Sequence, residues 1–178
     1  MKVDITTTRI KHVGHLWVQC CQTPISRPPA PSPLALQLAK AAGAKTIITS
    51  SSDEKLQFVT KKYGANYTIN YKTNPNWSEK VLECTKGEGA DYVINNAGVP
   101  TVEQSINSVK TGTGIVALVG ALTGMAHDKI PNVPLQTLMK SCVLRGIYVG
   151  PRTMLEDLVK VVAAHDLEMP VDQVFKFD

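Results

Sequence analysis

The sequence predicts a doubly wound α/β fold with a parallel sheet, and three observations support this prediction. From Leu34 onward, short apolar segments alternate with segments that have the spacing of amphipathic helices. The apolar segments are nearly continuous, which is typical of parallel strands covered on both faces. Eleven of the twelve glycines follow residue 42, where they can end helices and form turns.

Residues 1–33 have a different composition from the rest of the chain. The segment QTPISRPPAPSP, residues 22–33, contains five prolines and no glycine. Proline has no backbone N–H and biases the preceding residue away from helix, so we expect an extended linker there. The predicted organisation is therefore an atypical leader with a proline-rich linker over residues 1–33, followed by one α/β domain over residues 34–178.

The first predicted elements of the domain are a helix, a strand and a second helix. The first helix is expected over residues 34–44, with Gly43 as its stop signal, and the strand over residues 46–50. Ser51 and Glu54 have the spacing of a capping box, which predicts that the second helix begins there. The apolar side of this second helix consists of Leu56, Val59 and Tyr63.

The later elements continue the same alternation. A strand is expected over residues 66–70, a helix over residues 76–85 with Asn76 as its N-cap, and a strand over residues 91–96. Thr101 is expected to cap the next helix, whose inward residues are Val102, Ile106 and Val109. The remaining predicted elements are a strand at 114–120, a short helix at 134–140, a strand at 143–149, a helix at 154–165 and a strand at 173–177. The complete pattern predicts a Rossmann-like sheet.

The composition indicates a soluble globular protein rather than a membrane or nucleic-acid-binding protein. No apolar segment is long enough to span a membrane, and the N-terminus lacks the apolar core of a secretory signal, so we expect a cytoplasmic location. The net charge is +4, but residues 1–33 hold four basic residues and one acidic residue, which leaves 15 basic and 14 acidic residues in the domain. The four cysteines have no C-x-x-C spacing, so we expect reduced thiols and no zinc.

A parallel sheet of this kind binds ligands beyond the carboxyl ends of its strands. The candidate binding residues are therefore those that follow the predicted strands. They are Ser50, Ser51 and Ser52, then Asn95, Asn96, Ala97 and Gly98, then Gly120, Ala121 and Leu122, and finally Val149 and Gly150. This expectation follows from the architecture alone and specifies no reaction.

Four phrases between Leu34 and Phe177 carry a resemblance to a known family. They are LALQLAKAAGAKTIITSSSDEKL, KKYGANYTINYK, VALVGALTG and LRGIYVG. In these phrases, their order and their spacing, the chain resembles the cofactor-binding domain of the medium-chain dehydrogenases/reductases, which include zinc-type alcohol dehydrogenases and quinone oxidoreductases. The resemblance implies hydride transfer between a nicotinamide cofactor and a carbonyl, alcohol or enone.

The end of the second predicted strand favours NADP(H) as the cofactor. An NAD-type site places Asp or Glu there, whereas this chain has Ser50 and Ser51, whose small hydroxyls leave room for a 2′-phosphate. In the quinone-reductase-like branch, a helix lysine and the tyrosine of the I-N-Y phrase flank that phosphate, and they map to Lys55 and Tyr71. Asp53 does not replace the missing acid, because it lies inside the first turn of the helix. Taken singly, Ser51 is also explained as a helix cap and Lys55 as a solvated residue.

The expected cofactor-binding residues are Ser50, Ser51, Lys55, Tyr71, Asn96, Gly120, Ala121 and Leu122, and no residue is assigned a catalytic role. Two other patterns are interpreted as coincidental. GTGIVA, residues 112–117, matches a dinucleotide fingerprint but joins a helix to a strand, which is the reverse of the required context. INNAG, residues 94–98, resembles a phrase of short-chain dehydrogenases, yet no tyrosine here has a lysine four residues later.

The resemblance also shows what the chain lacks. HLWVQC, residues 15–20, resembles the first strand of the family, but the glycine-rich turn that should follow is replaced by CQTPISRPPAPSP. Those glycines allow close approach of the backbone to the pyrophosphate, so we expect impaired cofactor binding. The N-terminal catalytic domain and the last family elements are missing too, and we therefore expect a truncated chain without catalytic activity of its own.

Two functions are compatible with these observations. The first is a member of the NADP(H)-dependent oxidoreductase family that retains the adenosine part of the cofactor site. The second is a non-catalytic α/β module that associates with a full-length relative or with a second copy. Family members commonly dimerise through the edge strand of this domain, which corresponds to residues 143–149.

Overall fold

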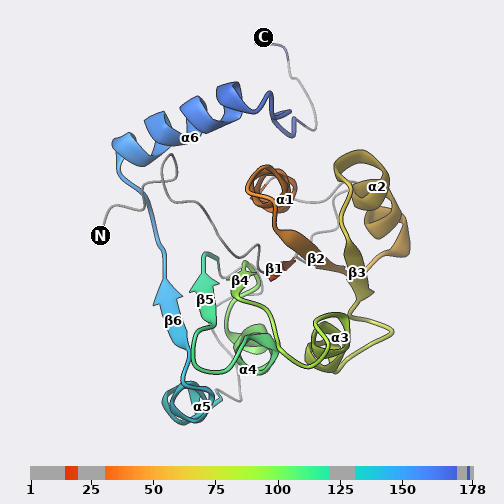
Figure 1. Cartoon of the computed structure of the whole chain (residues 1–178), viewed down its shortest axis with the longest axis vertical. Coiled ribbons are helices and arrows are strands. Elements are labelled where there is room, and N and C mark those ends of the chain that lie inside the picture. Colours follow the sequence, from red (N-terminus) through yellow and green to blue (C-terminus); the bar gives the residue numbers. More distant parts are fainter. Residues whose placement is uncertain (1–14, 20–30, 121–130, 172–175, 177–178) are drawn as a thin grey trace.

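The structure is a computed structural model in which residues 15–19, 31–120, 131–171 and 176 are described (Figure 1). The described strands form one six-stranded sheet in the order β3-β2-β1-β4-β5-β6, and every pair of neighbours is parallel. This order is that of the Rossmann fold, so the predicted fold class is confirmed. The strands are β1 (His15–Gln19), β2 (Lys45–Ser50), β3 (Tyr67–Asn70), β4 (Tyr92–Asn95), β5 (Ile115–Leu118) and β6 (Val143–Gly146).

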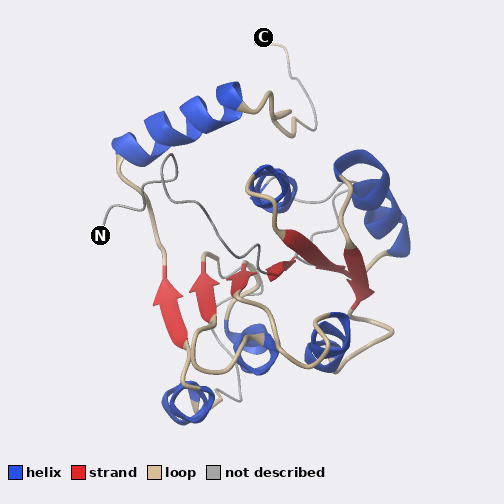
Figure 2. Ribbon diagram, in the orientation of Figure 1, coloured by secondary structure: helices blue, strands red, loops and turns tan. Residues whose placement is uncertain are grey.

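Helices cover both faces of the sheet (Figure 2). The helices α1 and α2 pack on β1, β2 and β3, and the helices α3, α4 and α5 lie on the opposite face. A short 3₁₀ helix, Val99–Thr101, precedes α4. The helices are α1 (Pro31–Ala41), α2 (Asp53–Tyr63), α3 (Trp77–Cys84), α4 (Val102–Ser108), α5 (Val133–Lys140) and α6 (Arg152–Ala164).

Neighbouring residues of β2 illustrate how the sheet separates two apolar cores. Ile48 is fully buried against α1 and α2, together with Leu36 and Val59. Ile47 points to the other face and belongs to the core under α3 and α4, which also contains Val116. Side chains alternate between faces along a strand, so a strand buried on both sides requires a continuous apolar sequence. The prediction of strands buried on both faces is thereby confirmed for β2, whereas β6 is largely exposed.

The first helix begins at Pro31 rather than at Leu34, so the predicted start was three residues too late. The first four N–H groups of a helix have no partner within the helix, and proline is therefore well suited to its first turn. The predicted strand from HLWVQC is confirmed as β1. The strand expected at residues 173–177 falls largely outside the described residues.

The N-cap of α2 is Ser52 and not Ser51, which corrects the predicted capping box. Ser52 has extended backbone angles, and its side chain accepts a hydrogen bond from the N–H of Lys55 at 3.4 Å. Asn76 and Thr101 occupy the predicted N-cap positions of α3 and α4 but form no capping hydrogen bond through their side chains. At the other end of α2, Gly64 adopts a left-handed conformation with φ of 66°.

The chain segment after α6 is fixed to α1 and α2. Gln37 of α1 donates to the carbonyl oxygen of Glu168 at 2.8 Å and accepts from its N–H at 3.0 Å. The Glu168 carboxylate is 2.7 Å from the Lys62 ammonium group of α2, and this hydrogen bond raises the pKa of Lys62. In the described part of the chain, no helix has the length and apolarity needed to cross a membrane.

The capping correction gives a direct test. We expect Ser52→Ala to lower the free energy of unfolding by about 1 kcal/mol, because it removes the acceptor for an N–H group of the first turn of α2. Ser51→Ala should leave stability nearly unchanged in the absence of ligand. Urea denaturation of the two variants measures the difference, and a larger loss for Ser51→Ala would contradict the assigned cap.

Candidate functional site

The strand order locates the candidate site. β1 pairs with β2 on one side and with β4 on the other, so the direction of strand succession reverses at β1. Ligands of open parallel sheets bind beyond the carboxyl ends of the strands at such a reversal. The residues of interest are therefore those that follow β2 and β3 on one side and β4 and β5 on the other.

The ends of β2 and β3 bring Ser50 and Tyr71 together. The N–H of Tyr71 donates to the carbonyl oxygen of Ser50 at 3.1 Å, which extends the pairing of the two strands by one residue. The Ser50 side chain is 2% exposed, and its hydroxyl oxygen accepts from the N–H of Ser52 at 3.4 Å. Ser51 and Lys55 follow in the loop and the first turn of α2, and both are half-buried. The backbones of the four predicted residues on this side therefore lie in one region, while the Tyr71 side chain packs against the core under α3 and α4.

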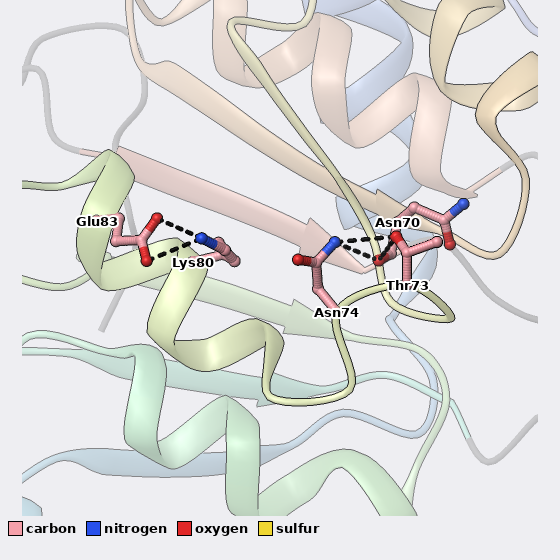
Figure 3. Close-up of polar contacts among 5 residues, drawn as sticks. All are labelled: Asn70, Thr73, Asn74, Lys80 and Glu83. Atoms are coloured by element: carbon pink, nitrogen blue, oxygen red, sulfur yellow. Dashed lines mark hydrogen bonds and ion pairs between the residues drawn. The ribbon is translucent and has the colours of Figure 1, made fainter.

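A hydrogen-bonded turn after β3 was not predicted from the sequence (Figure 3). The carbonyl oxygen of Asn70 accepts from the Thr73 hydroxyl at 3.1 Å and from the N–H and side-chain amide of Asn74, both at 3.0 Å. The side-chain oxygen of Asn70 accepts from the N–H of Lys72 at 3.0 Å. Its amide nitrogen donates to Asp53 of α2 at 2.9 Å. The cluster of Asn and Thr directly after a strand is the sequence signal that could have indicated this turn.

A groove of about 540 Å³ runs between α2 and the outer edge of β3. It is bordered by the Asn70 turn and lies beside the Ser50–Tyr71 pair, which does not line it. Eight of its nine lining residues have polar side chains, and the lining consists of Asp53, Leu56, Gln57, Thr60, Lys61, Thr68, Asn70, Thr73 and Asn74.

The end of β4 is held by a buried amide. Asn95 is fully buried, and its side-chain nitrogen donates to the hydroxyls of Thr101 and Ser105, both at 3.0 Å. Its side-chain oxygen accepts from the N–H of Gly98 at 2.8 Å. Gly98 has a φ of 96° and a ψ of −149°, which other residues rarely adopt. The buried network thus fixes a turn that requires glycine.

The same turn packs against the end of β5. Asn96 is 4% exposed, and the N–H of Val119 donates to the carbonyl oxygen of Asn95 at 2.9 Å. A Cβ added at Gly120 would lie 2.7 Å from the carbonyl oxygen of Asn96. The structure therefore brings two further predicted residues, Asn96 and Gly120, into close contact through their backbones. The predicted residues Ala121 and Leu122 lie outside the described residues.

Three further features considered in the sequence are the glycine-rich turn, a metal site and the cysteines. The position of the family's glycine-rich turn falls within residues 20–30, which lie outside the described part of the chain. Among the residues that the structure describes, no group of three or more His, Cys, Asp or Glu side chains is arranged to hold a metal ion. Burial raises the pKa of the thiols of Cys84 and Cys142, so both favour the neutral form, which is a weak nucleophile and metal ligand.

Comparison with known proteins shows which family has a similar sequence. Residues 33–164 match the family described as zinc-binding dehydrogenase. A zinc-type alcohol dehydrogenase-like protein of Schizosaccharomyces pombe is 41% identical over 150 residues, which cover 83% of this chain and 42% of the relative.

Solved structures of an alcohol dehydrogenase and a quinone oxidoreductase are also similar to this chain. A quinone oxidoreductase of Pseudomonas syringae pv. tomato is 27% identical with a TM-score of 0.71, over 92% of this chain and 50% of that one. An NAD-dependent alcohol dehydrogenase is also 27% identical, with a TM-score of 0.68, over 85% of this chain and 41% of that one. The chain thus spans half or less of the length of each of these proteins.

The contact between the two turns can be tested at Gly120. We expect Gly120→Ala to lower the free energy of unfolding by about 1–3 kcal/mol, because the new methyl group would overlap the backbone of Asn96. Gly146→Ala is the matched control, since no heavy atom lies within 4 Å of its added Cβ. Equal stability of the two variants in urea denaturation would show that the turns are not packed as described.

Proposed function

Because the chain belongs to the zinc-binding dehydrogenase family, we propose that its domain binds NADP(H) for hydride transfer to or from a carbonyl, alcohol or enone. When bound, the nicotinamide ring supplies the chemistry of hydride transfer. The described residues of this chain would hold and orient the cofactor. None of them is assigned a catalytic role, so we propose that the chain alone binds cofactor without turning over a substrate.

The single observation that favours NADP(H) over NAD(H) as the cofactor is the identity of the residue at the carboxyl end of β2. An acidic side chain at this position binds the ribose hydroxyls of NAD, whereas β2 ends in Ser50, which is buried and hydrogen-bonded within the loop. A carboxylate there would repel a 2′-phosphate, and a serine does not. Ser51 is proposed to donate a hydrogen bond to this phosphate, and Lys55 to supply positive charge.

Tyr71 is proposed as the second flank of the phosphate site. Its backbone is bound to Ser50, so its position depends on the same strand end that replaces the acid. The backbones at Asn96 and Gly120 are proposed to face the cofactor at the reversal of strand order, and Ala121 and Leu122 to continue that surface. The adenosine half is proposed as the part of the cofactor site that the described residues form.

A second candidate function is supported by the exposed edge of the sheet. Among the described strands, β6 pairs only with β5. Apolar residues on β6 and the adjacent α5 are exposed to solvent, including Val143 at 54% and Leu138 at 73%. An unpaired edge next to exposed apolar side chains favours association with another chain. We propose that this edge pairs with a second copy of the chain, and that the module acts as a subunit. Pairing of this edge with the same edge of a full-length relative is the alternative outcome of the test.

The cofactor proposal predicts a difference between NADPH and NADH. We expect the chain to bind NADPH more tightly than NADH, and Lys55→Ala to weaken NADPH binding about tenfold without affecting NADH, because only NADPH carries the 2′-phosphate. Fluorescence titration of both nucleotides measures the two dissociation constants. The control is Lys45→Ala, which removes the same charge at the opposite end of β2. Absence of saturable binding by either nucleotide would remove the cofactor proposal.

The association proposal predicts a concentration-dependent dimer. We expect Leu138→Glu to weaken dimerisation at least about tenfold, because a carboxylate would be buried in the apolar contact. Leu155→Glu on α6 is the matched control, since Leu155 is 61% exposed but lies on a helix at the opposite end of the molecule from α5 (Figure 1). Sedimentation velocity measures the state of each variant, and a monomeric wild-type chain at all accessible concentrations would contradict self-association.

A further inference from the structure

The hydrogen bond between Asn70 and Asp53 joins the two elements that carry the proposed phosphate ligands. Asn70 is the last residue of β3 and directly precedes Tyr71, and Asp53 opens α2 two residues before Lys55. The amide nitrogen of Asn70 lies 2.9 Å from a carboxylate oxygen of Asp53. The relative position of Tyr71 and Lys55 therefore depends on this contact as well as on the pairing of β2 with β3.

The side chain at position 70 must both donate and accept hydrogen bonds. Its nitrogen donates to Asp53, while its oxygen accepts from the N–H of Lys72. An aspartate could accept from Lys72 but could not donate to a second carboxylate, and the two negative charges would repel each other. An aliphatic side chain could do neither. The amide of asparagine satisfies both contacts with two separate atoms.

The contact also determines where the negative charge of Asp53 lies. Asp53 is adjacent in sequence to Ser52, and its side chain is exposed, so its orientation is set by the partner that binds it. Asn70 binds the carboxylate on the β3 side of α2, where Asp53 lines the groove between α2 and β3. Released from Asn70, the carboxylate could turn toward the serine loop. Like charges repel more strongly as their separation falls, so this rotation would disfavour a phosphate there.

We propose that Asn70 is a specificity-determining residue, which acts by positioning. It holds the Asp53 carboxylate away from the serine loop and fixes the turn that carries Tyr71. It thereby sets the preference of this site for adenosine nucleotides with a 2′-phosphate. The inference rests on the proposed function, because it concerns the phosphate subsite of the same NADP(H) site.

The test uses adenosine 2′,5′-bisphosphate and 5′-AMP as probes, because neither contains the pyrophosphate of the complete cofactor. We expect the wild-type chain to bind the bisphosphate more tightly than 5′-AMP. Asn70→Ala should reduce this ratio of affinities about fivefold and leave 5′-AMP binding unchanged, since a modest electrostatic change acts only on the 2′-phosphate. Chemical-shift titration measures both constants and shows that each variant is folded.

Asp53→Asn separates the effect of charge from that of the turn. This variant keeps a side-chain oxygen that can accept from Asn70 but removes the negative charge, so it should retain or raise the preference for the bisphosphate. In the Asp53→Asn background, Asn70→Ala should change the ratio by less than half as much as in the wild type, because the two residues act together. Glu83→Gln on α3 is the control, since it removes the same charge from an exposed ion pair with Lys80 (Figure 3).

The possible failures can be told apart. If the wild-type chain does not prefer the bisphosphate, the proposed NADP(H) function is wrong and this assignment is wrong with it. If the wild type has the preference and Asn70→Ala keeps it, the function stands and the role of Asn70 is refuted. If Asn70→Ala lowers the ratio equally in the wild-type and Asp53→Asn backgrounds, the positioning of Asp53 is refuted.

Discussion

The two halves of the candidate site depend on β1, the strand that joins them. β1 pairs with β2 and with β4, and no other described strand connects the two halves of the sheet. Its five residues therefore set the relative position of Ser50 and Asn96, which follow the neighbouring strands. Parallel pairing brings together segments that are distant in sequence, so the site forms only when the complete sheet forms.

The two halves use polar groups in different ways. On the β4 side, the donors and the acceptor of the Asn95 amide are engaged inside the protein, which stabilises the turn at Gly98 rather than binding a ligand. On the β2 side, Ser51 and Lys55 are half-buried and lie at a loop and a helix start, where polar groups reach the surface. In the proposed function, one half would therefore supply a rigid backbone surface, and the other would supply the side chains that select a nucleotide.

The sequence was sufficient for features that depend on periodicity but not for those that depend on local competition or distant contacts. Leu56, Val59 and Tyr63 could be assigned to one buried face because helical spacing determines it. Ser51 and Ser52 are both adequate caps by sequence, and the hydrogen bond from the N–H of Lys55 shows that Ser52 is the cap. The bond from Asn70 to Asp53 spans 17 residues and joins two elements, so no local pattern indicates it.

The N-terminus of α1 corresponds to the pyrophosphate of a dinucleotide, and it lies on a different element from the residues proposed to bind the adenosine part. A helix N-terminus binds a pyrophosphate through the free N–H groups of its first turn. In α1 the first turn contains Pro31 and Pro33, which have no N–H to offer. The phosphate-binding capacity of this helix is thereby reduced, whereas the groups at Ser50, Lys55 and Tyr71 belong to β2, α2 and the turn after β3. Because different elements would carry the two proposed subsites, a weak pyrophosphate contact would leave the proposed adenosine subsite intact. In the proposed function, the selectivity of this chain for nucleotides would therefore be governed by the β2–β3 end of the sheet.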